Sequence, residues 1–77
     1  MSKAEKILQQ MRNNPKDWRI EDLETVAGRY GLDIRRHGGS HVIFSHPEVI
    51  QHVTVPAKNP VKPPYIRQFL AMLDLLI

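Results

Sequence analysis

The sequence predicts an α+β fold in which a three-stranded antiparallel sheet is covered on one face by helices, in the order α–α–β–β–β–α. Three observations support this prediction. Apolar residues follow helical spacing over the first thirty residues, alternate at two-residue spacing over residues 32–55, and return to helical spacing at the end of the chain. With 77 residues and no cysteine, we expect one small domain without disulfides or thiolate metal sites.

The first helix is expected over about residues 3–13. Its apolar residues recur at the spacing of one buried helix face, namely Ala4, Ile7, Leu8 and Met11. The helix should end near Asn14, because Pro15 disfavours helical geometry in the residue before it.

The second helix is expected over about residues 19–30. Asp17 is the predicted N-terminal cap, and Gly31 suits the position just past the C-terminal end. The stripe expected to be buried comprises Ile20, Leu23, Val26, Ala27 and Tyr30.

Three strands are expected next, over Leu32–Arg36, Ser40–Ser45 and His52–Val55. His37-Gly38-Gly39 has the length and chemistry of a three-residue hairpin loop, and a second turn is expected around His46-Pro47-Glu48.

Two-residue alternation assigns the strand residues to two faces. The core face should hold Val42, Phe44, Val53 and Val55. The open face should hold His41, Ile43, Ser45, His52 and Thr54, which puts His52 and Thr54 beside His41.

A basic, proline-rich segment over residues 56–64 cannot form regular structure, so we expect an ordered loop beside the sheet. The last helix should begin near Pro64. It carries more apolar surface than one buried stripe requires, and we assign most of this surface to the core rather than to a partner.

Charge is unevenly distributed along the chain. Residues 1–34 carry six cations and six anions, whereas residues 35–67 carry five cations against Glu48 alone and hold all four histidines. This basic half is compatible with a polyanion such as nucleic acid and equally with an ordinary solvated face.

No apolar run approaches the length of about 20 residues that a membrane span needs, and the N-terminus lacks the features of a signal peptide. We therefore expect a cytoplasmic protein without membrane association. Because so small a domain buries a modest core, a partner or a homo-oligomer is a further expectation.

Gly38-Gly39-Ser40-His41 is the segment with the clearest chemical potential. Glycines allow a left-handed turn and close approach of a phosphate. His41 follows directly, and imidazole is the side chain whose ordinary pKa suits acid–base chemistry near neutral pH.

Several segments in order resemble the HicA family of small bacterial toxins. They are Gly31-Leu32, Gly38-Gly39-Ser40-His41-x-x-Phe44, Val53-Thr54-Val55-Pro56, the basic proline loop and the closing helix. The resemblance covers about residues 18–73. It divides the chain into a toxin core over 18–77 and a helical extension over 1–14 that short family members lack.

This resemblance implies a fold like the double-stranded-RNA-binding domain and activity as a metal-independent mRNA endoribonuclease. It also implies neutralisation by a HicB-like antitoxin. The catalytic histidine of the family corresponds to His41, flanked by Gly39 and Ser40.

Metal-free RNA cleavage needs proton transfer and cations beside the phosphate. His41 offers the first, and the candidate substrate-binding residues are Gly39, Ser40, Lys58, Lys62, Arg35 and Arg36. Glu48 is the lone carboxylate in this half, which does not suit a two-metal nuclease, so no metal or cofactor is expected.

The second catalytic group stays open at this stage. His37 lies across the hairpin loop and His52 lies on the third strand, but each is read more simply as an exposed residue without a catalytic role. Two alternative functions also remain: a non-catalytic RNA-binding module with the same basic face, and a protein-interaction subunit.

Overall fold

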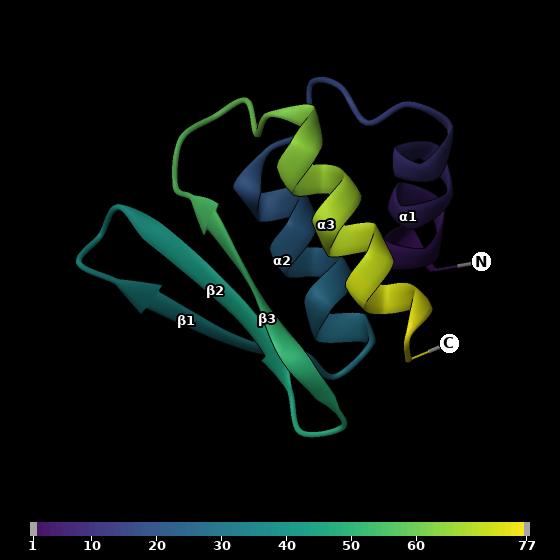
Figure 1. The fold of residues 1–77 in the computed structure, drawn as a ribbon. Coiled ribbons are helices and arrows are strands. Elements are labelled where there is room, and N and C mark those ends of the chain that lie inside the picture. The colour runs from purple at the N-terminus through teal and green to yellow at the C-terminus, as the bar shows by residue number, and fades with distance from the viewer. Residues whose placement is uncertain (1, 77) are drawn as a thin grey trace.

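The computed structural model describes residues 2–76 and confirms the α+β architecture (Figure 1). The elements are α1 (Lys3–Asn13), α2 (Ile20–Arg29), β1 (Asp33–His37), β2 (His41–His46), β3 (Val49–Pro56) and α3 (Pro63–Asp74). The antiparallel sheet has the order β1-β2-β3. Helices α2 and α3 cover one face of the sheet, and α1 lies against α2 on the side away from the strands.

Helix α1 contributes to the same hydrophobic core as the rest of the fold. Ser2 caps it by accepting a hydrogen bond from the Glu5 N–H at 3.2 Å, and the predicted stripe is buried, with Met11 fully inaccessible. Two ion pairs tie its surface to the other helices: Arg29–Glu5 at 3.3 Å and Arg12–Asp74 at 2.6 Å. Exposed pairs of this kind add at most about 1 kcal/mol each, so the apolar stripe is the main attachment of α1.

The predicted cap of α2 is wrong. Arg19 occupies the N-cap position, and its backbone N–H donates to Asp22 Oδ2 at 3.0 Å. Asp17 lies earlier, in a left-handed turn with φ of 64°. The start of α2 is therefore stabilised by the carboxylate of Asp22, which lies within the helix, and not by Asp17, which precedes it.

The C-terminal end of α2 follows the prediction. Gly31 has φ of 74°, and the Leu32 N–H donates to the Ala27 carbonyl at 2.9 Å, closing a Schellman-type turn. Tyr30, expected in the buried stripe, is half-buried and packs against the edge of the core.

Strand alternation sets the two faces of the sheet as predicted. Val42 and Phe44 are inaccessible, and Val53 and Val55 are buried beside them. The Phe44 ring meets Phe69 of α3 edge-on, with centroids 5.0 Å apart and planes at 64°. This contact joins the middle strand to the closing helix.

The third strand is longer than predicted, beginning at Val49 and not at His52. Phe44 pairs with Val53 and His46 pairs with Val49, so three β3 residues, Ile50–His52, lie where β2 has only Ser45. β3 therefore has two more residues than β2 in this segment, an irregularity of the pairing, while Val49, Val53 and Val55 stay buried on the same face. The first two strands and their loop are each shifted by one residue from the prediction, so the loop comprises Gly38, Gly39 and Ser40.

Across residues 2–76, none of the helices has both the length and the apolar character needed to cross a membrane.

Met11→Ala should lower the free energy of unfolding by about 2–5 kcal/mol, because it leaves a cavity between α1 and the core. Chemical denaturation of the variant beside Gln10→Ala, an exposed neighbour on the same helix, measures the difference. Equal stability of the two variants would show that α1 does not stabilise the core.

Alanine at two glycines should have opposite effects. Gly39→Ala should destabilise by about 1 kcal/mol because φ is 73° there, whereas Gly28→Ala, within α2 and with open space around it, should stabilise by about 0.5–1 kcal/mol. Thermal unfolding of both variants checks the signs, and a stabilised Gly39→Ala would contradict the left-handed turn.

Candidate active site

A tight glycine turn presents His41 at the free end of the sheet. Gly38 and Gly39 have φ of 60° and 73°, and the Ser40 N–H donates to the His37 carbonyl at 3.3 Å. Residues with side chains rarely adopt two consecutive left-handed conformations, so the turn depends on both glycines. It ends at Ser40, and His41 is the first residue of β2.

His41 is exposed on the sheet face opposite the helices. Its neighbour Val42 is buried on the helical side, and alternation turns the imidazole the other way. Ser40 Oγ lies 3.0 Å from His41 Nδ1, within hydrogen-bond distance. This contact engages Nδ1 and leaves Nε2 as the other ring nitrogen for a further partner.

The strand register defines the neighbours of His41. His37 of β1 pairs with it on one side and Pro56 of β3 pairs with it on the other. Directly opposed residues share a face, so the three form a row across the end of the open face. The next row contains Arg35, Ile43 and Thr54.

The register does not bring His52 beside His41, contrary to the prediction. His52 belongs to the irregular segment opposite Ser45, which is four residues, or about 13 Å, along β2 from His41. Thr54, the other residue expected there, lies opposite Ile43. His41 pairs with Pro56, and His52 lies four residues before Pro56 on β3, so the regular part of the register already puts it toward the far turn.

The basic loop begins at the edge of the His41 row. The Ala57 N–H donates to the Ser40 carbonyl at 2.8 Å, which continues the β2–β3 pairing past Pro56. Further along, the Val61 N–H donates to the Trp18 carbonyl at 2.7 Å, and the Val61 side chain is buried. The loop is therefore ordered and lies beside the sheet, as predicted.

Asn59 ties the middle of this loop to the start of α2. Its Oδ1 accepts from the Ile20 N–H at 2.8 Å, and its Nδ2 donates to Glu21 Oε2 at 3.5 Å. A hydrogen bond from its own backbone N–H lowers the pKa of Glu21, and Arg19 and Asn59 lower this pKa further. The Glu21 carboxylate thus stays ionised at neutral pH, as an acceptor for Asn59.

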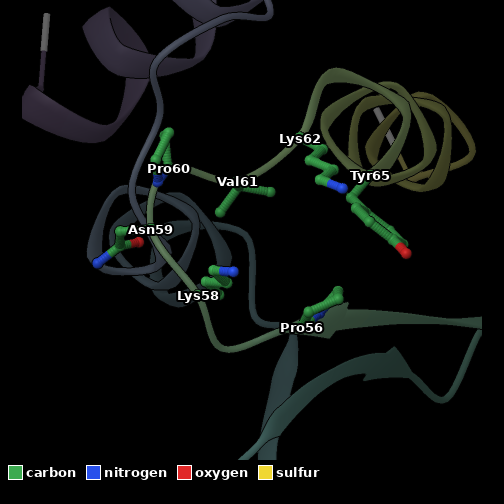
Figure 2. A pocket seen from close by; sticks show the side chains of 7 residues that line it. All are labelled: Pro56, Lys58, Asn59, Pro60, Val61, Lys62 and Tyr65. Atoms are coloured by element: carbon green, nitrogen blue, oxygen red, sulfur yellow. The ribbon is translucent and has the colours of Figure 1, made fainter.

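The loop and the first turn of α3 enclose a pocket of about 330 Å³ (Figure 2). It is lined by Pro56, Lys58, Asn59, Pro60, Val61, Lys62 and Tyr65. Figure 2 shows Lys58 and Lys62 on two sides of Val61, whereas Asn59 points away toward α2. Pro56 both lines the pocket and neighbours His41, so the pocket adjoins the histidine row.

The two candidate arginines lie on opposite faces. Arg35 pairs with Ile43 on the open face, one row from His41. Arg36 pairs with the buried Val42, and its Nη2 donates to Glu24 Oε2 of α2 at 2.8 Å. Arg36 therefore joins the hairpin to the helices and lies outside the His41 surface.

The site thus combines an exposed imidazole with nearby cations, an arrangement that can transfer protons and bind an anionic phosphate. Within residues 2–76, no group of three or more His, Asp or Glu side chains is arranged to hold a metal ion. Sequence reasoning identified the lysines of the pocket but missed Tyr65. The available signal was its position one helical turn after Lys62, which brings both to the same helix face.

Comparison with known protein families gives one finding that bears on this site. The sequence model of a family described as "HicA toxin of bacterial toxin-antitoxin" matches residues 20–75. Searches of curated proteins and of solved structures gave no match. The matched segment runs from α2 to the end of α3 and includes the glycine turn, His41 and the basic loop. Because the match spans well over half of the sequence, the chain belongs to the HicA toxin family of bacterial toxin–antitoxin systems.

Proposed function

We propose that this toxin is a metal-independent endoribonuclease that cuts mRNA in the cytoplasm and is neutralised by a HicB-like antitoxin. The observation that carries the proposal is the exposed His41 imidazole, held by Ser40 and adjoining the pocket that contains Lys58 and Lys62.

RNA can be cut without a metal because its own 2′-hydroxyl is the nucleophile. The reaction needs a base for the 2′ proton, an acid for the 5′-oxygen and cations for the charge that develops on the phosphoryl oxygens. A positioned histidine contributes about 10²–10⁴-fold in rate. His41 performs one proton transfer at Nε2, and the lysines stabilise the charge on the phosphoryl oxygens.

The substrate lies across the end of the open face, from the glycine turn toward the pocket. Gly38 and Gly39 have no side chains to obstruct the backbone, and the cut phosphate lies against His41. In the pocket, the Tyr65 ring offers a stacking surface to an unpaired base, with Lys58 and Lys62 beside the adjoining phosphates. Arg35, one row away, is a further phosphate contact.

Membership of the family implies a cognate antitoxin. We place its docking site on the same open face, where Ile43 is a half-buried apolar residue between Arg35 and Thr54. An antitoxin bound there covers His41 and blocks access of RNA.

His41→Ala should slow RNA cleavage by at least about 10²-fold, while the fold and RNA binding persist because the side chain is exposed. Gel analysis of a labelled transcript, with and without a chelator, measures this loss, and circular dichroism checks folding. His52→Ala is the matched control, because it removes an exposed histidine at the other end of the same face.

Two results would contradict this function. Cleavage by His41→Ala at the wild-type rate would remove the mechanism. Binding of RNA by the wild type with no cut product would favour the non-catalytic RNA-binding module.

Lys58→Ala and Lys62→Ala should each weaken RNA binding and reduce the slope of log K against log salt by about 0.7, the value for one phosphate contact on a single strand. Fluorescence anisotropy over a range of salt concentrations, in the His41→Ala background, measures both effects. Lys6→Ala, on the exposed surface of α1, is the control. An unchanged slope in both loop variants would place the RNA elsewhere.

A further inference from the structure

His37 directly opposes His41 in the β1–β2 ladder, and both side chains are exposed. Directly opposed residues of antiparallel strands share a face and have Cβ atoms about 4.5–5.5 Å apart. The three-residue turn between them sets this pairing, because the length and type of a hairpin turn determine the strand register. Gly38 and Gly39 both adopt the left-handed conformation in this turn. The two side chains therefore start from neighbouring positions on the open face.

Of the strand neighbours that the described register gives His41, His37 is the one suited to a second proton transfer. The partner of His41 on the other side is Pro56, and the next row offers Ile43, Thr54 and Arg35, whose guanidinium does not give up its proton. Among residues 2–76, His37 is the only histidine paired with His41, because His46 and His52 lie toward the far turn.

We propose that His37 is the second catalytic group of this site, the general acid that protonates the 5′-oxygen while His41 acts as the general base. The proposal rests on the proposed endoribonuclease function and assigns the group that this function leaves open.

The Ser40 contact is compatible with His41 as the base. In the tautomer that carries its proton on Nδ1, His41 donates to Ser40 Oγ across the 3.0 Å contact, and Nε2 presents a lone pair to the 2′-hydroxyl. His37, in its protonated form, then serves as the acid. Each proton transfer needs its oxygen, the 2′-oxygen for His41 and the 5′-oxygen for His37, within about 2.6–3.2 Å of the reacting nitrogen. In an RNA bound between the two rings, these two oxygens lie on opposite sides of the phosphorus.

The step balances without any other reactant. The 2′-oxygen forms a bond to phosphorus as its proton passes to His41 Nε2, and the bond from phosphorus to the 5′-oxygen breaks as that oxygen takes a proton from His37. The products are a 2′,3′-cyclic phosphate and a 5′-hydroxyl. His41 ends protonated and His37 neutral, and exchange with water restores both.

A substrate whose leaving group needs no proton separates the two roles. In a short RNA with sulfur in place of the 5′-oxygen at one linkage, departure of the thiolate does not require an acid. His37→Ala and His37→Gln should each cut ordinary RNA at least about 10²-fold more slowly than the wild type, yet cut the sulfur-containing RNA at close to the wild-type rate. His41→Ala should be slow on both substrates, and His52→Ala should match the wild type on both.

Single-turnover rates and thermal unfolding of each variant complete the test. Wild-type rates for the His37 variants on ordinary RNA would overturn the proposal while an inactive His41→Ala still supported the endoribonuclease function. Equal losses on the two substrates would also overturn the acid role. A wild type that cuts neither RNA would contradict the endoribonuclease function itself, and this proposal with it.

Discussion

The edge-on contact between Phe44 and Phe69 is the interaction on which the orientation of the sheet depends. Both rings are fully buried, and the contact fixes the middle strand against α3. Such a pair adds about 0.5–1.5 kcal/mol beyond the burial of the two side chains, and that burial is larger still. The exposed ion pair between Arg36 and Glu24 contributes less, so apolar packing decides which way β2 faces. Because side chains alternate along a strand, burial of Phe44 on one face leaves His41 on the other.

A second set of contacts fixes where the cations lie relative to that histidine. The basic loop has little regular structure, but Val61 is buried in the core and pairs with Trp18, and Asn59 binds the first N–H of α2. The loop thus joins the start of α2 to the start of α3. Lys58 and Lys62, on either side of these anchors, remain exposed and close to Pro56. Ordering the loop before substrate arrives reduces the entropy lost on binding.

Most of the fold could be predicted because its elements follow simple periodicities. Helical spacing gave Met11 and Leu23 as core residues, and alternation gave Val42 and Phe44. The errors arose where one local pattern competes with another. Asp17 and Asp22 are both plausible partners for the start of α2, and geometry selects Asp22. Alternation assigns His52 to a face but not to a partner, and the register that pairs His41 with Pro56 puts His52 toward the far turn. Arg35 and Arg36 are adjacent in sequence, and register alone separates their faces. The pairing of His37 with His41 likewise depends on a turn one residue later than expected.

Alternate residues of β2, from His41 to Phe44, are subject to different evolutionary constraints. Substitutions at the buried Val42 and Phe44 affect the stability of the fold, whereas substitutions at His41 and Ile43 affect binding to the open face. If an antitoxin covers that face as proposed, Ile43 and Thr54 are free to change together with it while the buried residues stay constant. Recognition of the antitoxin can then change without loss of stability, because the residues that change do not belong to the buried core.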